Sequence, residues 1–304
     1  MNRESRLKFI KKLSARPMPI SYDVVWDFAE IFIDNLTNKI DEYGLSVMEY
    51  LNKIYSMDSI QNAAFSMSKK KYSIDKVSGE KSEVTIIARI DPNSENSALY
   101  NTNGKRDIIK VVMGKSSIDS LFKNLMLSDI SLDEVSAATL NYIEDFITQA
   151  IVHELTHATD VIPRNKRVEK EFGKNDDNFY FSSREELKAH INETVYEAGT
   201  IMVDMDPEEI IEMSLIDFLE KNSSVYKTLK EKLIINPGDE NINVPGGTLA
   251  KKKRKAWKQY LLSIYQWWTK QVERMQSERK VARIQRQNFL DPVLSKLINN
   301  ERKI

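Results

Sequence analysis

Apolar residues in the first part of the chain recur every three or four positions, which is the period of an amphipathic helix. The pattern begins after Ser21 and ends near Gly44, and its members are Val25, Phe28, Ile31, Phe32 and Leu36. A second run with the same period follows through Met48, Leu51 and Ile54. The N-terminal region is therefore predicted to contain two consecutive helices.

The pattern changes after residue 65. Residues 66–81 are rich in Lys and Ser and contain Gly79, so we expect a linker or a long loop there. Two short β-branched runs then occupy residues 84–90 and 107–113, with turn residues at 91–93 and 101–104 between them. Such runs predict two or more strands of a small sheet.

Helix-start signals follow the predicted strands. Ser131–Glu134 and Ser182–Glu185 have the spacing of a capping box, and Asp206 precedes a Pro at a first helical position. The first of these helices is expected to run on into residue 153 and to end at Pro163, and the second to end at Gly199. After turns at 236–239 and 245–247, a long basic helix carries one apolar stripe, formed by Trp257, Leu261, Ile264 and Trp268.

Together these elements indicate an α+β protein that is predominantly helical, with a small sheet before the central helix and helical extensions at both ends. We divide the chain into an N-terminal helical region (residues 1–80), a core (81–205) and a C-terminal helical region with a basic tail (206–304). No apolar run approaches the ~18 residues that span a bilayer, and the N-terminus lacks the apolar stretch of a signal peptide. We therefore expect no membrane partner and a location in the cytoplasm or in a virion.

The formal net charge of zero conceals a basic C-terminal tail. Residues 249–304 contain 15 Lys and Arg against 4 Asp and Glu, so the first 248 residues carry the opposite charge. The cations of Lys251–Lys255, followed by aromatic residues, are typical of nucleic-acid binding. The core spacing of the apolar stripe instead favours packing of this helix onto the body. A nucleic acid, an acidic partner and the acidic remainder of the chain are the candidate contacts of the tail.

The strongest chemical signal is an HExxH motif at residues 153–157. Two of the chain's three histidines, His153 and His157, are four positions apart and project from one helix face, with Glu154 between them. The surrounding residues are uncharged, as a helix buried against a catalytic cleft requires. Because the chain has no Cys, only His and carboxylates are available as strong metal ligands. The pattern favours a catalytic Zn²⁺ site over two ordinary histidines, with Glu154 as general base.

A catalytic zinc ion has three protein ligands and an open position for water, so a third ligand must come from elsewhere in the chain. The next predicted helix carries four candidates on one face, at spacings of four, three and four: Glu186, His190, Glu193 and Glu197. The residues by themselves leave the choice of ligand open.

An HExxH motif followed by a Glu on a second helix resembles the gluzincin class of zinc metallopeptidases. Residues 186–190 (ELKAH) are similar to the Glu-x-x-Ala-Asp element of that class. The resemblance implies a zincin-like core, hydrolysis of peptide bonds and Glu186 as the third ligand. His190 departs from the pattern, because an Asp that orients a ligand histidine is common at this position. Residues 192–197 resemble instead an element of thermolysin-like enzymes, which implies Glu193 as the ligand and Glu197 as the orienting group.

The resemblance covers residues 107–199, and within it the motif, Tyr180 and the later Glu-x-x-Ala are similar to peptidases encoded by phages and prophages. It implies that Glu154 takes a proton from the attacking water and that a second electrophile stabilises the developing oxyanion. The candidates for that electrophile are Tyr180, Tyr196 and an unliganded His190.

Two further expectations concern the surroundings of the motif. Asp160 is placed either to orient a ligand imidazole or to cap the helix end. The strand over residues 108–113 is expected, from the resemblance, to be the sheet edge to which a peptide substrate adds. The competing hypothesis is a structural or interaction protein, for example a virion component, whose zinc site is vestigial or is closed by a fourth protein ligand.

Overall fold

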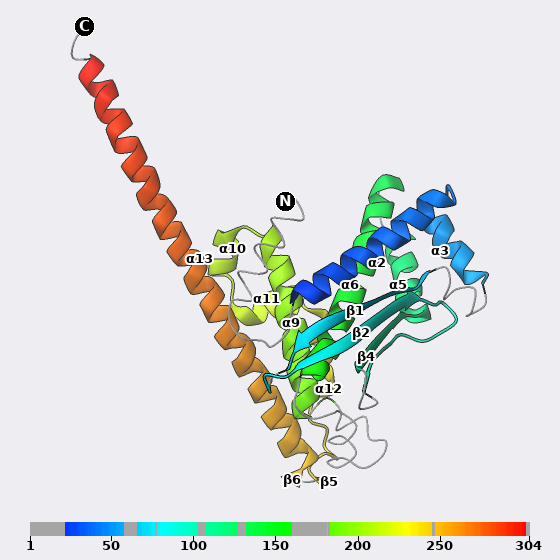
Figure 1. Cartoon of the computed structure of the whole chain (residues 1–304). Coiled ribbons are helices and arrows are strands. Elements are labelled where there is room, and N and C mark those ends of the chain that lie inside the picture. Colours follow the sequence, from blue (N-terminus) through cyan, green and yellow to red (C-terminus); the bar gives the residue numbers. More distant parts are fainter. Residues whose placement is uncertain are drawn as a thin grey trace.

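The computed structural model describes residues 22–57, 66–76, 78–102, 107–126, 132–159, 181, 183–244 and 247–301. Over these residues the protein is a predominantly helical α+β structure with a four-stranded sheet (Figure 1), as the sequence predicts. The elements before the motif are α2 (Tyr22–Glu42), α3 (Val47–Tyr55), β1 (Ser68–Asp75), β2 (Lys81–Ile90), β3 (Ser97–Thr102), β4 (Asp107–Met113) and α5 (Lys115–Met126). The motif lies in α6 (Leu132–Thr159), which is followed by α9 (Arg184–Asp204), α10 (Pro207–Glu212), α11 (Leu215–Asn222), α12 (Ser224–Lys232), β5 (Asn243–Val244), β6 (Gly247–Thr248) and α13 (Leu249–Glu301).

The two predicted N-terminal helices are confirmed as α2 and α3. Between them the chain turns at Gly44, whose φ of 60° is a left-handed conformation that Gly adopts without strain. Helix α3 starts with a capping box, because Ser46 Oγ accepts from the Glu49 N–H and Glu49 Oε2 accepts from the Ser46 N–H. The apolar faces of both helices are buried in the same hydrophobic cluster as the sheet and α6.

The sheet has the order β1-β2-β4-β3, in which β2 and β4 are parallel and each outer strand is antiparallel to its neighbour. The expected linker over residues 66–81 is wrong, since β1 lies there. Its residues alternate between the solvent and the core, with Ser68 and Ile74 buried, so its Lys and Ser residues are compatible with a half-buried strand. The expected turn at 101–104 is also wrong in its first half, because Asn101 and Thr102 pair with β4.

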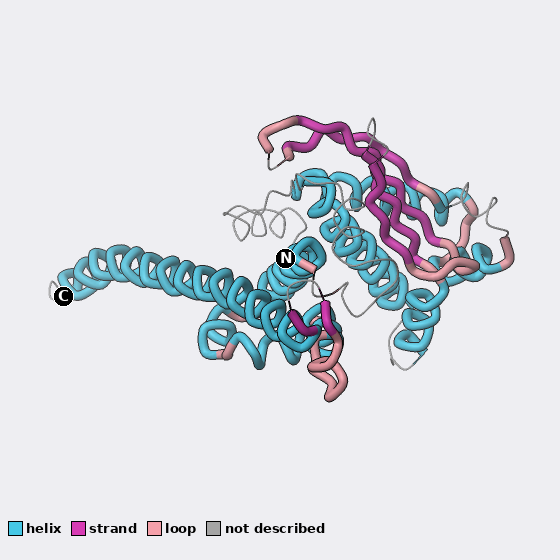
Figure 2. The backbone as a smooth tube through the Cα atoms, turned by 90° about the horizontal axis from the view of Figure 1, so that it is seen from below, coloured by secondary structure: helices cyan, strands magenta, loops and turns pink. Residues whose placement is uncertain are grey.

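Two hydrophobic clusters organise the protein. Helices α2 and α6 pack against the sheet and enclose the first cluster with it. The second cluster lies among α9, α10, α11, α12 and α13. Figure 2 shows the sheet at one side of the protein and α13 at the other, and the packing of α6 against α9 joins the two parts. The motif helix therefore lies at the boundary between the two clusters.

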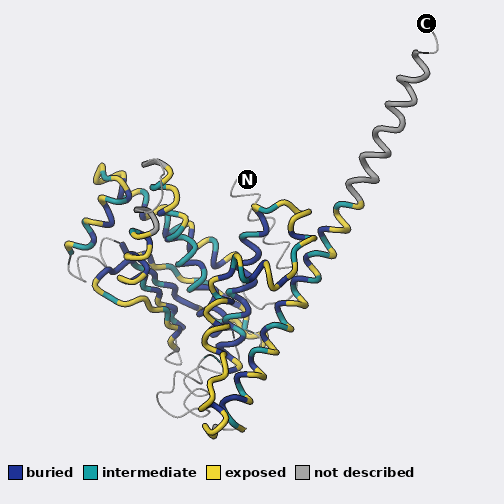
Figure 3. The backbone as a smooth tube through the Cα atoms, turned by 180° about the vertical axis from the view of Figure 1, so that it is seen from behind, coloured by how far each residue is buried: buried dark blue, intermediate teal, exposed yellow. Residues whose placement is uncertain are grey.

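The predicted packing of the basic C-terminal helix onto the body is confirmed for α13. Ile264 and Trp268 are buried, and Trp257 and Leu261 are partly buried against the second cluster. Exposed and buried residues alternate along α13 up to residue 280 (Figure 3), and toward its C-terminal end the helix points away from the body (Figure 1). Neither α13 nor any other described helix has an apolar stretch long enough to cross a membrane.

Part of the basic run in α13 is neutralised within the chain. Lys253 is buried, and its Nζ lies 2.9 Å from Asp239 Oδ2 and donates to the Ile234 carbonyl at 3.0 Å. Arg254 forms an ion pair with Glu240. These contacts agree with docking of the tail onto the acidic remainder of the chain, whereas binding of a nucleic acid or an acidic partner stays a prediction.

Gly114 sets the position of the loop that leads into β3. A Cβ at this residue would lie 2.4 Å from the Ser94 carbonyl oxygen and 2.4 Å from the Glu95 carbonyl carbon. The Gly114 N–H donates to Asn96 Oδ1 at 2.8 Å, and the Lys115 N–H donates to the Ser94 carbonyl at 2.8 Å. The two backbone segments can approach this closely only because Gly114 has no side chain.

Gly114→Ala is expected to lower the free energy of unfolding by about 1–3 kcal/mol, because the backbone atoms that the new Cβ meets cannot move aside as a flexible side chain would. Urea denaturation followed by circular dichroism measures the difference. Gly238→Ala is the matched control, since nothing lies within 4 Å of its Cβ, and it should change stability by less than about 0.5 kcal/mol. Equal stabilities of the two variants would contradict the close approach.

Candidate metal centre

The HExxH motif lies in the last two turns of α6. This 28-residue helix confirms that one helix runs from the first capping signal into the motif, while the expected end at Pro163 lies outside the described residues. His153, Glu154 and His157 are 7%, 2% and 4% exposed. Their apolar helix neighbours are fully buried in the first hydrophobic cluster, so α6 holds the polar side chains of the motif against the interior.

The side chains of the three predicted ligands converge at one point. His153 Nε2 lies 3.1 Å from Glu186 Oε2 and 3.2 Å from His157 Nε2. His157 Nε2 lies 3.4 Å from Glu186 Oε1. Four ligands arranged tetrahedrally around zinc at 2.0–2.1 Å are separated from one another by about 3.3 Å. The three residues therefore fit a zinc ion in both donor type and spacing.

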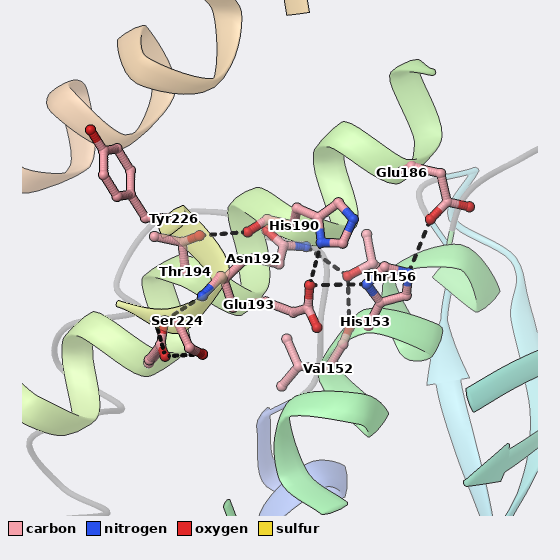
Figure 4. Close-up of polar contacts among 12 residues, drawn as sticks. Val152, His153, Thr156, Glu186, His190, Asn192, Glu193, Thr194, Ser224 and Tyr226 are labelled. Atoms are coloured by element: carbon pink, nitrogen blue, oxygen red, sulfur yellow. Dashed lines mark hydrogen bonds and ion pairs between the residues drawn. The ribbon is translucent and has the colours of Figure 1, made fainter. Parts of the chain in front are cut away.

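Glu186 reaches this point because of the way α9 begins. The N-cap residue is Ser183, whose Oγ accepts from the Glu186 N–H at 3.2 Å, so the helix starts one residue later than the predicted capping box. Glu186 thus occupies the first turn, where a carboxylate is favoured by the helix dipole. Its side chain is fully buried and extends toward His153 on α6 (Figure 4).

A polar contact further along α9 fixes this helix against α6. Asn192 Nδ2 donates to Thr156 Oγ1 at 2.8 Å, and the Thr156 hydroxyl donates to the Val152 carbonyl at 2.8 Å (Figure 4). Both side chains are buried, so neither could be left without a partner at low cost. This pair was not found from the sequence, because an Asn and a Thr on separate helices give no signal of their own.

Glu193 contacts Nδ1 of His153, the ring nitrogen that does not contact Glu186. Its Oε2 lies 3.1 Å from His153 Nδ1 and 2.6 Å from His190 Nδ1 (Figure 4). Glu193 is therefore on the Nδ1 side of His153, away from the point where the Nε2 atoms and Glu186 converge. A carboxylate in this position orients a ligand imidazole from outside the metal shell.

The other two acidic or phenolic candidates on α9 are engaged elsewhere. Glu197 accepts from Ser223 Oγ at 2.5 Å and from the N–H of Ser224 at 2.8 Å, so it binds the start of α12 and does not orient a histidine. The implied orienting role of Glu197 is wrong for this reason. Tyr196 is buried in the first cluster with its ring 5.5 Å from that of Trp26, and it does not line the cavity beside the motif.

His190 lies close to two of the candidate ligands and also lines the cavity. His153, Glu186 and His190 form a group whose donor atoms lie within 4.8 Å of one another. We also include His157 among the candidate ligands, because its Nε2 lies 3.2 Å from His153 Nε2 and 3.4 Å from Glu186 Oε1. Both distances are close to the roughly 3.3 Å expected between two ligand atoms of a tetrahedral zinc site. The ring of His190 is stacked on Phe181 at 5.5 Å, and its Nε2 is buried without a hydrogen-bond partner among the described residues.

The charges in the site depend strongly on one another. Burial alone would lower the pKa of His153, but the carboxylates of Glu193 and Glu186 outweigh it and raise that pKa to about 10. Burial opposes ionisation of Glu193, yet His153 and His190 lower its pKa to about 2. The pKa of Glu186 falls well below its usual range, against its burial, through its contacts with His153 and His157. A divalent cation at this point would hold the carboxylates ionised in place of the ring protons.

Glu154 lies beside a cavity of about 340 Å³. Its Oε2 accepts from the backbone N–H of Tyr100 in β3 at 2.6 Å. The cavity is lined by His153, Glu154, His190, Ala98, Phe146 and Phe181, among others. The expected edge strand over residues 108–113 is wrong, since β4 is paired on both sides and β3 is the edge strand. Sequence reasoning missed the contact from the Tyr100 N–H to Glu154, because a backbone donor leaves no signature in the side chains.

Two predicted site residues, Tyr180 and Asp160, lie outside the described residues. The structure thus brings together six of the residues that the sequence singles out: His153, Glu154, His157, Glu186, His190 and Glu193. In comparisons with protein-family models, with curated proteins and with solved structures, nothing matches this chain.

Glu186→Ala is expected to weaken zinc binding by more than about 100-fold, because it removes a proposed ligand. Glu193→Ala should still bind one zinc ion, with an affinity lower by about 10–100-fold, because it removes only a residue that orients the His153 ring. Competition with a chromophoric chelator measures both constants, and Glu212→Ala on the exposed face of α10 is the control. A larger loss in Glu193→Ala than in Glu186→Ala would move the third ligand to Glu193.

Proposed function

We propose that this protein is a zinc-dependent peptidase of the HExxH type with a zincin-like core. The observation that carries the proposal is the convergence of the His153, His157 and Glu186 side chains beside a cavity, where the two Nε2 atoms and the two carboxylate oxygens are separated by 3.1–3.4 Å in the closest pairs. A zinc ion held by these residues would polarise a scissile carbonyl and lower the pKa of a water to about 7.

Glu154 is the general base and later the general acid of the proposed reaction. It follows His153 directly in the helix and lies in the wall of the cavity, with one carboxylate oxygen fixed by the Tyr100 N–H. From this position it takes the proton of the attacking water and returns it to the leaving amine. Its burial keeps bulk water away from the transferred proton.

His190 is the candidate electrophile for the developing oxyanion. Its Nδ1 is bound to Glu193, so its other ring nitrogen, Nε2, is the one available to a substrate in the cavity. When Nε2 also carries a hydrogen, it donates to the oxyanion. This role is supported by the absence of a described partner for His190 Nε2.

The edge strand β3 supports a peptide as the substrate. One side of β3 is paired with β4, and Ser97 and Ala98 in its first half line the cavity together with Glu154. The other side is the sheet edge, where an extended chain can add through main-chain hydrogen bonds. Since the Tyr100 N–H is directed at Glu154, this edge would bring a peptide bond close to the proposed base.

A second candidate function is a closed structural zinc site in an interaction protein. The proximity of His190 to His153 and Glu186 favours it, because His190 would supply a fourth protein ligand. Substitution of His190 separates the two functions, since a fourth ligand is needed for binding of the metal and an oxyanion donor is not.

Glu154→Gln is expected to retain bound zinc and to reduce kcat for a peptide substrate by about 10²–10⁴-fold, because the isosteric amide cannot accept the proton. Atomic absorption measures whether zinc is retained, and turnover of a fluorogenic peptide library measures the loss of activity. Wild-type turnover by this variant would contradict the assignment of the base.

His190→Ala is expected to leave zinc affinity close to that of the wild-type protein and to lower kcat by about 10²–10³-fold with little change in KM. The measurement is steady-state kinetics at saturating zinc, together with the chelator competition. A large loss of zinc affinity would instead support the closed structural site.

A further inference from the structure

One carboxylate oxygen lies between two imidazole rings in this site. Glu193 Oε2 is 2.6 Å from His190 Nδ1 and 3.1 Å from His153 Nδ1 (Figure 4). Both nitrogens must carry a hydrogen to donate to this oxygen, because an ionised carboxylate only accepts. The same oxygen therefore sets both rings with Nδ1–H toward Glu193 and with Nε2 pointing away from it.

The two rings have different surroundings on their Nε2 sides. His153 Nε2 lies among the proposed ligand atoms, 3.1 Å from Glu186 and 3.2 Å from His157 Nε2. His190 Nε2 is buried, has no partner within the described residues, and belongs to a side chain that lines the cavity. The rings lie against each other with centroids 4.9 Å apart, so a shift of Glu193 would displace both.

We propose that Glu193 is a shared positioning residue, in which one carboxylate orients the metal-ligand ring of His153 and the substrate-facing ring of His190. The inference deepens the proposed function and rests on it for its kinetic test. In this arrangement the strength of metal binding and the stabilisation of the reacting carbonyl both depend on one side chain. Sequence spacing hides this role, because Glu193 is three residues from one ring and forty from the other.

The competing account makes Glu193 a ligand-orienting group alone, with its contact to His190 as simple neighbour packing on α9. Under that account, removal of Glu193 weakens the metal site but leaves the tautomer and the function of His190 unchanged. The two possibilities therefore predict different tautomers of the His190 ring after Glu193 is removed, and an experiment that reports on this ring distinguishes them.

Nuclear magnetic resonance of ¹⁵N-histidine-labelled protein provides a direct readout, because the chain has only three histidines and all lie in this site. In the wild-type protein, His153 and His190 should both show a slowly exchanging Nδ1–H. In Glu193→Ala, both signals should exchange rapidly and His190 should populate both tautomers. His157, which has no contact with Glu193, is the internal control. An unchanged His190 signal in this variant would overturn the shared role.

The same spectra of metal-free protein separate failure of this inference from failure of the proposed function. Both Nδ1–H bonds to Glu193 should be present without zinc, since they use ring nitrogens that face away from the proposed ligand atoms. A protein that lacks zinc binding and peptidase activity but shows both bonds would contradict the proposed function and leave the shared contact supported. Glu193→Gln, whose amide oxygen still accepts, should retain part of the protection and thus exclude misfolding as the cause.

A double-mutant cycle then tests the functional consequence. At saturating zinc, Glu193→Ala should lower kcat by about 10-fold or more in the wild-type background and by less than about 2-fold when His190→Ala is already present. Its effect on zinc affinity, about 10–100-fold, should be the same in both backgrounds. Equal effects of Glu193→Ala on kcat in the two backgrounds would overturn the proposal.

Discussion

The contact between α6 and α9 is the interaction on which the candidate site depends. Helix α6 presents two imidazoles and a carboxylate on one face, and α9 brings Glu186 to 3.1 Å from His153. Neither helix holds a complete ligand set by itself. Their relative position is fixed by the bond between Asn192 and Thr156 and by the apolar clusters on either side of the pair. A shift of about 1 Å between the helices would separate the three donor atoms.

Helix α9 must satisfy polar groups on both of its faces. Toward α6 it presents Glu186, Asn192 and Glu193 to the site, and toward the C-terminal helices Thr194 forms a hydrogen bond with Tyr260 of α13 at 2.8 Å. Glu197 binds the start of α12. Burial of so many polar groups is tolerable only when each has a partner, because an unpaired buried charge costs several kcal/mol. The long basic helix α13 therefore contributes to the site indirectly, by packing α9 from behind.

Much of the fold could be predicted from the sequence where one physical signal dominated. The period of α2, the start of α6 at Leu132, the Asp-Pro start of α10 and the stripe of α13 are all found in the structure. Strand β1 could not be predicted, because its Lys and Ser residues hide an alternation that only pairing with β2 explains. Strand β3 lies in a segment that resembles a turn, and its pairing with β4 is a long-range interaction that local pattern does not reveal.

In the candidate site, too, the local sequence pattern predicts some residues, whereas others depend on contacts between distant parts of the chain. His153, Glu154 and His157 follow from spacing within one helix, whereas the choice between Glu186 and Glu193 depends on which way two side chains of α9 point. The contacts favour Glu186, because it lies at His153 Nε2, beside His157, whereas Glu193 lies at His153 Nδ1. The bond from the Tyr100 N–H to Glu154 involves a main-chain donor and could not have been inferred from residue types.

We propose that zinc binds at the junction of α6 and α9 with three protein ligands and an open position. A crystal structure of the zinc-loaded protein, with anomalous diffraction recorded at the zinc absorption edge, would locate the ion and identify its ligands. We expect one anomalous peak within about 2.0–2.2 Å of His153 Nε2, His157 Nε2 and a Glu186 oxygen, with water as the remaining ligand. A peak bound by Glu193, a fourth ligand from His190, or no peak at this junction would contradict it.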